Sequence, residues 1–315
     1  MGKKVTIIGA GSVGSTIAYT MAVNGIATEI VMIDINETKV LGEALDIRQG
    51  LPFCGTRSVY AGGYAEAENS DMVIITSGLP RKPGQTRLEL AQVNVDILKG
   101  IMPKITKYAP DAIYLLVANP VDILTYTFVK YSGIPEHRVF GSGTMLDSVR
   151  LRARLAEYYD IDSKYITAYA LGEHGDSMFV PWSIMSINGI GTRLYEEKCE
   201  EKGSMMPAID RAEIEKYVRT SGGRVIARKG ATYYAVSMSV AHMCRCVLEN
   251  FGTVLPVSVM MHGEHGVSDV CLSYPTMLNC NGVQTKIPTP LSPEEEALLR
   301  RSADALKSVI SGLAF

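Results

Sequence analysis

The stretch Val5-Thr6-Ile7-Ile8-Gly9-Ala10-Gly11-Ser12-Val13-Gly14 decides the fold of the first half of the chain. A short apolar run leads directly into the pattern G-x-G-x-x-G, and residues 13–23 then carry apolar side chains at helical spacing. In this pattern Gly9 permits a tight turn, Gly11 lets a pyrophosphate approach the backbone, and Gly14 allows close packing of helix on strand. The phosphates then meet unpaired N–H groups at the start of the helix, so we predict a dinucleotide site.

An acidic residue indicates which dinucleotide binds. Asp34 follows the second apolar run, about twenty residues after Gly14, where a carboxylate hydrogen-bonds the 2′-hydroxyl of the adenine ribose. The same carboxylate repels a 2′-phosphate, so the pattern favours NAD over NADP. The alternative is a glycine-rich turn without a ligand. The expected cofactor contacts are Gly9, Gly11, Ser12, Val13, Gly14, Asp34, Thr76, Gly78 and Asn119.

Short apolar runs alternate with helical patterns through the first half of the chain. The runs are rich in Val, Ile and Leu, as in strands of a parallel sheet that is covered on both faces. This alternation predicts an α/β fold of the Rossmann type, a doubly wound parallel sheet. The expected strands are residues 5–8, 29–33, 71–76 and 112–117, and the expected helices are residues 13–23, 37–49 and 88–107.

The second half of the chain is less regular and predicts an α+β catalytic domain. We therefore expect an NAD-binding domain at residues 1–143 and a substrate domain at residues 144–315, with the boundary near Gly141–Gly143. The expected helices here are residues 146–159, 209–229, 232–250 and 293–311, and the expected antiparallel strands are residues 253–262, 267–274 and 282–286.

Composition excludes several classes of function. The 315 residues carry a formal net charge of −2, so the chain lacks the basic surplus of a nucleic-acid-binding protein. No apolar run reaches the ~18 residues of a membrane span. Met1-Gly2-Lys3-Lys4-Val5-Thr6 fits the myristoylation template, but it overlaps the first strand, so we expect a cytoplasmic protein without a lipid. No zinc or other metal site is expected, because paired CxxC spacing is absent among Cys54, Cys199, Cys244, Cys246, Cys271 and Cys280.

Three further motifs carry candidate catalytic side chains. The stretch Gly172-Glu173-His174-Gly175-Asp176-Ser177 places one histidine among small and polar residues. Asp147 and Arg150 are three positions apart on an expected helix, so they project from one face. Asn119-Pro120 follows an expected strand, at the carboxyl edge where open α/β sheets bind their ligands.

With these motifs the chain resembles the lactate/malate dehydrogenase family over essentially its whole length. The resemblance implies that His174 donates a proton to a ketone oxygen as hydride arrives, and takes it back in the oxidation direction. Asp147 would hold the imidazole and favour its charged form, and Arg150 would bind the substrate carboxylate through its planar guanidinium. Arg87, on a mobile loop, would swing in to polarise the carbonyl, and Asn119 would bond the substrate or the nicotinamide ribose.

The same residues have ordinary interpretations as well. A lone histidine in a loop is usually a packing or surface residue, and an Asp/Arg pair at helical spacing is usually a surface ion pair. An NAD-binding protein that has lost its chemistry is a second hypothesis, although Arg87, Asp147, Arg150 and His174 are all present. A third is an NAD-dependent glycoside hydrolase, which would need metal ligands such as Cys199 and His242.

The sequence points in two directions on the substrate. Glu173, Trp182 and Thr232, the last an expected substrate contact, are of the lactate type. Arg81 in the mobile loop is of the malate type, because lactate enzymes usually carry Gln there. A guanidinium facing the far side of the ketone would pair with the second carboxylate of oxaloacetate, whereas pyruvate would leave the charge without a partner. We expect a lactate-dehydrogenase-like scaffold that admits oxaloacetate; the alternatives are a true malate dehydrogenase and an Arg81 that faces solvent.

The resemblance also bears on assembly, backbone and regulation. It implies a homotetramer or a dimer, and a cis peptide bond between Asn119 and Pro120. Relatives that fructose 1,6-bisphosphate activates pair an Arg with a His across a subunit interface. Arg152 matches the Arg, but Thr167 stands in the place of the His, so we expect no strong activation.

Overall fold

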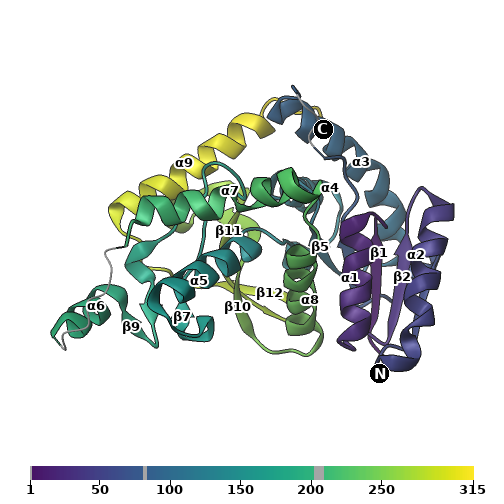
Figure 1. Ribbon diagram of the computed structural model, residues 1–315. Coiled ribbons are helices and arrows are strands. Elements are labelled where there is room, and N and C mark those ends of the chain that lie inside the picture. The colour runs from purple at the N-terminus through teal and green to yellow at the C-terminus, as the bar shows by residue number, and fades with distance from the viewer. Residues whose placement is uncertain (1, 81–83, 202–208) are drawn as a thin grey trace.

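The computed structural model describes residues 2–80, 84–201 and 209–315 (Figure 1). Arg81, on which the oxaloacetate hypothesis depends, lies outside these ranges.

Six parallel strands form the first half of the main sheet, in the order β3-β2-β1-β4-β5-β6. This is the predicted doubly wound order, with helices on both faces (Figure 1). The apolar runs form strands whose side chains are buried on both faces of the sheet, which is why these runs are apolar throughout. The strands are β1 (Lys4–Ile8), β2 (Glu29–Ile33), β3 (Ser58–Ala61), β4 (Met72–Ile75), β5 (Ile113–Leu116) and β6 (Val139–Gly141).

The helices of this half are α1 (Ser12–Val23), α2 (Glu37–Gln49), α3 (Arg87–Tyr108) and α4 (Val121–Tyr131). Three of them lie within one residue of their predicted bounds. Helix α4 was not predicted; eight of its eleven residues are buried, among them the polar Asp122, Thr125 and Thr127. Strands β3 and β6 were also missed: β3 is not a continuous apolar run and is only partly buried, and β6 is three residues long.

The strands of the second half extend the same sheet. Strand β10 (Thr253–His262) pairs antiparallel with β6 where Ser258 faces Gly141, and β11 (Ser268–Asn279) and β12 (Gly282–Lys286) follow. The sheet therefore has nine strands and continues across the expected boundary at residue 143. Strand β11 continues beyond the predicted end at Tyr274, because Pro275 lies opposite Pro256 and the ladder resumes on both sides.

Helices and a small sheet complete the second half. The helices are α5 (Met145–Tyr159), α6 (Thr192–Glu201), α7 (Arg211–Lys229), α8 (Tyr234–Leu248) and α9 (Pro293–Ile310). Helix α7 begins two residues later than predicted, because the Asp210 side chain caps it by accepting from the Glu213 N–H. The small sheet was not predicted, since its strands β7 (Ile166–Thr167), β8 (Ser186–Ile187) and β9 (Ile190–Gly191) have two residues each. Single 3₁₀ turns are Leu51–Phe53, Ala65–Ala67, Glu136–Arg138, Ser163–Tyr165, Trp182–Ile184 and Glu264–Gly266.

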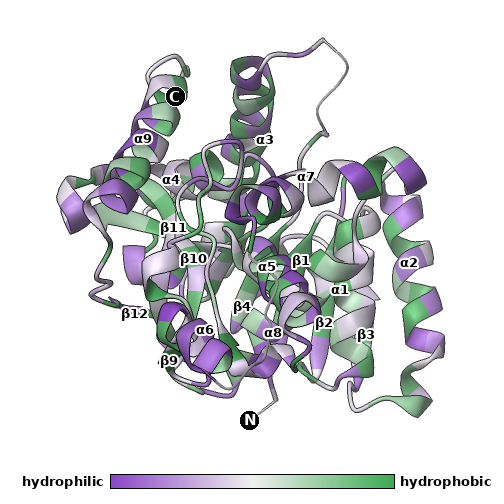
Figure 2. Ribbon diagram, turned by 60° about the vertical axis from the view of Figure 1, so that its left-hand side comes forward, coloured by the Kyte–Doolittle hydropathy of each residue, from purple (hydrophilic) through white to green (hydrophobic). Residues whose placement is uncertain are grey.

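The main hydrophobic core lies along the large sheet and the helices packed against it. Figure 2 shows hydrophobic strands at the centre of the molecule and hydrophilic stretches on the outer helices. A second cluster, which includes Leu151, Leu155, Ile166 and Val218, joins α5 and α7 to the small sheet. Across the described ranges, no helix combines the length and the apolar character needed to cross a membrane.

Candidate active site

The glycine-rich stretch forms the predicted turn between β1 and α1. Gly9 has φ +104°, which glycine adopts at little cost. A Cβ on Gly14 would overlap the carbonyl oxygen of Gly9, so helix and turn touch there. A Cβ on Gly11 would meet no atom of the described residues within 4 Å, so its backbone is open to a ligand.

The N-terminus of α1 suits an anion. Gly11 is the N-cap residue, no side chain caps the helix, and its first turn, which includes Ser12 and Val13, holds no acidic residue. The first N–H groups of α1 are therefore not occupied by a side-chain cap. The carboxylate of Asp34 lies beside this turn, where it accepts from the Ala10 N–H at 2.6 Å and from the Asn36 N–H at 2.9 Å. These residues fit the pyrophosphate and adenine ribose of NAD.

Two other expected cofactor residues, Thr76 and Gly78, follow strand β4 and make different contacts. The Thr76 hydroxyl donates to the carbonyl oxygen of Gly9 at 2.9 Å, so it braces the glycine-rich backbone. A Cβ on Gly78 would lie 3.3 Å from the side-chain oxygen of Asn94. Asn94, which the sequence analysis missed, is fully buried and donates to the carbonyl oxygens of Leu79 at 3.0 Å and Asn119 at 2.7 Å. It ties the start of the substrate loop to the end of β5.

The predicted contact between His174 and Asp147 is present. Nδ1 of His174 lies 2.6 Å from Oδ2 of Asp147, and Nη1 of Arg150 donates to Oδ1 of the same carboxylate at 3.0 Å. Asp147 is buried, whereas the side chain of His174 is 29% exposed. Because Nδ1 faces Asp147, Nε2 is the ring nitrogen left for a substrate.

The electrostatics of this pair favour a charged imidazole. Burial by itself lowers the pKa of His174, but the charge and hydrogen bond of Asp147 outweigh it and raise that pKa to about 9. Burial likewise raises the pKa of Asp147, and its contacts with His174 and Arg150 outweigh that effect, so the pKa of the carboxyl group is lowered. At neutral pH the two groups form an ion pair.

Arg87 differs from its predicted setting. It is the first residue of α3, because Thr86 and Glu89 form a capping box at this point. Its guanidinium already contacts the histidine loop, with Nη1 3.1 Å from Oε1 of Glu173 and Nη2 on the carboxylate of Asp176. Arg87 therefore lies beside the histidine loop, and its swing toward a bound substrate stays a prediction.

The remaining expected substrate residues surround this cluster less closely. Asn119 is exposed at the end of β5, and its peptide bond to Pro120 is cis, as predicted. Arg150 faces α7, where a Cβ on Gly222 would lie 3.8 Å from its guanidinium nitrogens. Thr232 lies in the connection between α7 and α8, half-buried.

Sequence reasoning missed the side chains that hold the histidine loop from behind. Asp122 accepts from the His174 N–H at 2.7 Å, and the Ser302 hydroxyl accepts from the Glu173 N–H at 2.6 Å. Asp122 stands only two positions after Pro120, so its place near the substrate edge was a usable signal. Ser302 offers none, because 129 residues separate it from Glu173.

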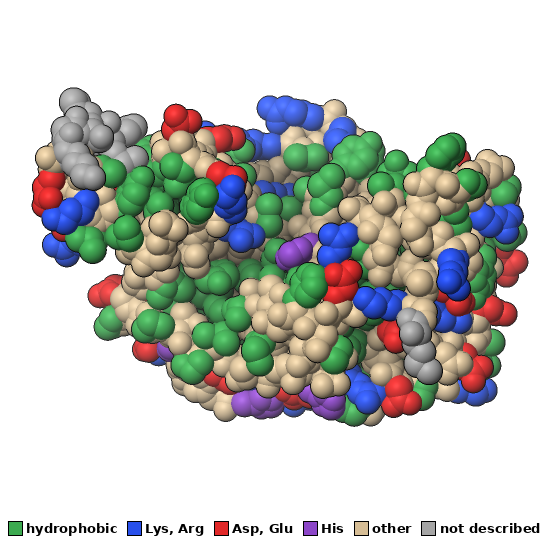
Figure 3. Space-filling view, turned by 90° about the horizontal axis from the view of Figure 1, so that it is seen from below, with side chains coloured by type: hydrophobic (Ala, Val, Ile, Leu, Met, Phe, Trp, Pro, Cys, Tyr) green, Lys and Arg blue, Asp and Glu red, His purple; other side chains and the backbone are tan. Residues whose placement is uncertain are grey.

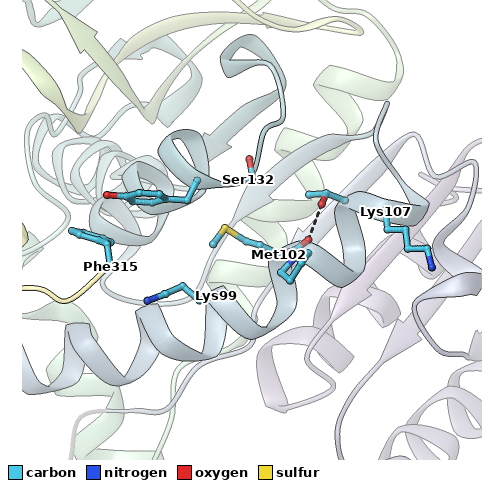
Figure 4. A pocket seen from close by; sticks show the side chains of 8 residues that line it. Lys99, Met102, Lys107, Ser132 and Phe315 are labelled. Atoms are coloured by element: carbon cyan, nitrogen blue, oxygen red, sulfur yellow. Dashed lines mark hydrogen bonds between the residues drawn. The ribbon is translucent and has the colours of Figure 1, made fainter.

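Cavities alone do not locate this site. Figure 3 shows one face of the molecule, where hydrophobic side chains gather in a hollow and basic side chains and a histidine lie beside it. A pocket of about 580 Å³ that opens to the surface lies elsewhere, between α3, α4 and the C-terminal segment (Figure 4). It is lined by Lys99, Met102, Pro103, Thr106, Lys107, Tyr131, Ser132 and Phe315, none of them an expected site residue.

Within the described part of the chain, no group of three or more His, Cys, Asp or Glu residues could hold a metal ion.

Comparisons with known proteins show the family of the chain. The family described as lactate/malate dehydrogenase, NAD binding domain, matches residues 3–141, and the lactate/malate dehydrogenase alpha/beta C-terminal domain matches residues 144–314. The L-lactate dehydrogenase of Acetivibrio thermocellus is 43% identical over 311 residues, which cover 99% of this chain and 97% of the relative. That of Thermoanaerobacter sp. is 46% identical over 98% of this chain and 99% of the relative.

A solved structure has the same fold. The minor L-lactate dehydrogenase of Enterococcus mundtii superposes with a TM-score of 0.94 at 37% identity, and the match covers 100% of this chain and 99% of that one. The fold and the site thus define an NAD-dependent oxidoreductase that acts on CH–OH groups. The chain belongs to the lactate/malate dehydrogenase family. This sets aside the non-enzymatic and glycoside hydrolase hypotheses.

Proposed function

We propose that this enzyme interconverts pyruvate and L-lactate, with His174, Asp147 and Arg87 as its catalytic residues. The observation that carries the proposal is the cluster in which one Asp147 carboxylate bonds both His174 and Arg150. It joins a proton donor to a cation suited to a substrate carboxylate, which is what a 2-keto acid requires. The L-lactate dehydrogenases that cover nearly the whole chain support the same substrate.

Each side chain then has a distinct task. Arg150 binds the substrate carboxylate through its planar guanidinium, and Thr232 and Asn119 complete the contacts around the substrate. His174 holds a proton on Nε2 and gives it to the ketone oxygen, while Asp147 stabilises the charged ring from the other side. Arg87 donates to the carbonyl oxygen and stabilises its developing negative charge.

NAD, when bound, accepts or supplies the hydride. The chain's own part is to hold its phosphates at the start of α1 and its adenine ribose at Asp34. Gly9, Gly11 and Gly14 keep the backbone of the turn close enough for this, and Thr76 braces that backbone.

We also propose that Arg81 lets the enzyme reduce oxaloacetate. The support is the charge of this residue, which complements the second carboxylate of oxaloacetate. Initial rates with NADH and either pyruvate or oxaloacetate test both proposals. Pyruvate turnover with measurable oxaloacetate turnover supports them. A strong preference for oxaloacetate would make the chain a malate dehydrogenase, and no turnover of either substrate would overturn the proposed function.

Finally, we propose that the enzyme is a cytoplasmic homo-oligomer. Large apolar side chains are exposed on α2, on the turn after it and at the start of α8, among them Leu41, Leu45, Phe53, Tyr234 and Met238. Exposed large apolar side chains on neighbouring elements are common at subunit interfaces, and they support association here. All six cysteines are free thiols, which is consistent with a reducing compartment.

A further inference from the structure

The carboxylate of Asp122 is enclosed directly behind the catalytic loop. Asp122 is the second residue of α4 and only 2% exposed. Its Oδ2 accepts from the backbone N–H of His174 at 2.7 Å, and its Oδ1 accepts from the Ser258 hydroxyl on β10 at 2.6 Å. One buried carboxylate therefore joins α4, the central sheet and the histidine loop.

Backbone bridges from Leu171 to Phe179 and from Gly172 to Ser273 of β11 hold the base of this loop, and side chains bind the next two N–H groups. The N–H of Glu173 is bound by Ser302 of α9, and the next N–H, that of His174, is bound by Asp122 of α4. The imidazole of His174 is in turn bound by Asp147 of α5. The histidine is thus held at its backbone by one carboxylate and at its ring by another.

We propose that Asp122 is a positioning residue for His174, which fixes the backbone of the histidine and places a second negative charge behind its ring without touching the substrate. The inference rests on the proposed role of His174. It extends that role, because the proton donor then depends on two carboxylates from different elements rather than on Asp147 alone.

The groups around Asp122 leave it ionised, so that its negative charge can act on His174. The groups that face it are His174 and Glu173 from the loop, Ser258 from β10 and the buried thiol of Cys271 from β11. Burial raises the pKa of Asp122 more than the hydrogen bonds from Ser258 and His174 lower it, so the net pKa is about 6. Its place in the first turn of α4 also favours the anion. The carboxylate is therefore ionised over the pH range in which His174 releases its proton.

The variant Asp122→Asn separates charge from geometry. The amide oxygen can still accept from the His174 N–H, and the Ser258 hydroxyl can turn to accept from the amide NH₂. The hydrogen bonds are retained while the negative charge is lost. Ser258→Ala is the matched control, because it disturbs the same buried place but keeps the charge and the bond to His174.

The test is the pH dependence of kcat/KM for pyruvate in the holoenzyme, with NADH binding measured alongside. In Asp122→Asn the alkaline fall should move down by about one pH unit, a tenfold change in proton affinity, with NADH affinity unchanged. In Ser258→Ala the fall should stay in place. An NMR titration of the His174 ring, assigned with His174→Ala, should show the same shift without relying on turnover.

Two results would overturn the inference. One is an Asp122→Asn enzyme whose alkaline fall and ring titration match the wild type, even if it melts earlier, since that describes a purely structural carboxylate. The other is an equal shift in Ser258→Ala. If Asp122→Asn does not fold, Asp122→Ser offers the same loss of charge with an acceptor for the loop. A wild-type enzyme that reduces neither pyruvate nor oxaloacetate would instead defeat the proposed function.

Discussion

At the scale of single residues, the proposed proton-transfer role of His174 makes the rate in each direction depend on the ionisation of this side chain. Asp147 raises the pKa of this imidazole to about 9, so the ring is charged at neutral pH. Reduction of a ketone needs the charged ring, whereas oxidation of an alcohol needs the neutral one. The two directions must therefore respond to pH in opposite ways.

We predict that kcat/KM for pyruvate reduction is constant at neutral pH and falls as the pH rises through about 9. The value of kcat/KM for lactate oxidation should rise over the same interval. Initial rates in both directions from pH 6 to 10 measure this, with NADH and NAD binding followed separately. A reduction rate that already falls near the ordinary histidine pKa would show that Asp147 does not hold the proton.

A second prediction concerns Arg81. Arg81→Gln should lower kcat/KM for oxaloacetate by roughly ten- to a hundredfold, because a charge-assisted pair is lost. Pyruvate should be unharmed or improved, since an unpaired charge leaves the closed site. Arg87→Gln is the control, and it should damage both reactions alike because it acts on the carbonyl common to both. An unchanged ratio of the two kcat/KM values in Arg81→Gln would mark Arg81 as a solvated side chain.

Two contacts in the site could not be predicted from the sequence. His174, Asp147 and Arg150 could be predicted because each stands in a recognisable local pattern. The bonds from Arg87 to Glu173 and from Asp122 to His174 join residues 86 and 52 positions apart. Such pairs depend on tertiary packing, which no spacing along the chain encodes.

At the scale of elements, the glycine turn and α1 make a testable unit. Gly14→Ala should destabilise the fold, because its Cβ would overlap the carbonyl oxygen of Gly9. Gly11→Ala should fold normally, since its backbone is extended and its Cβ meets nothing. That methyl group would stand where the pyrophosphate approaches, so NADH affinity should fall at least about tenfold. Thermal melts and NADH titrations of both variants measure the contrast; normal NADH binding by Gly11→Ala would contradict the assigned cofactor site.

Elements with a strong periodic signal were predicted closely, and the others were missed for identifiable reasons. Helices α1, α2 and α9 and strands β2, β10 and β12 match their predicted bounds to within a residue. Helix α4 buries polar side chains such as Asp122, Thr125 and Thr127, so polar residues along it do not mark an exposed face. The two-residue strands of the small sheet are too short to show alternation. Helix α6 was missed as well, and the missed α4 is the helix that carries Asp122.

At the scale of the whole molecule, exposed apolar side chains predict association. Light scattering at micromolar concentration should give the mass of a dimer or a tetramer. Leu41→Glu on α2 should shift the protein toward smaller species, because it places a charge in the apolar surface. Leu298→Glu, on an exposed position of α9, is the control and should leave the mass unchanged. A monomeric wild-type enzyme would contradict the assembly proposal.

Regulation by fructose 1,6-bisphosphate is the last property that the assembly would control. Arg152 of α5 is half-buried, and burial lowers the pKa of its guanidinium, while Thr167 of β7 is exposed and neutral. One cation binds a phosphate far less firmly than two, so we predict that the sugar bisphosphate changes KM for pyruvate by less than about twofold. Thr167→His should increase the response, most of all below pH 7 where the added imidazole is charged. Arg152→Gln should abolish it in both backgrounds. Steady-state kinetics with and without the effector measure all three, and strong activation of the wild type would require a phosphate site that does not depend on a histidine at position 167.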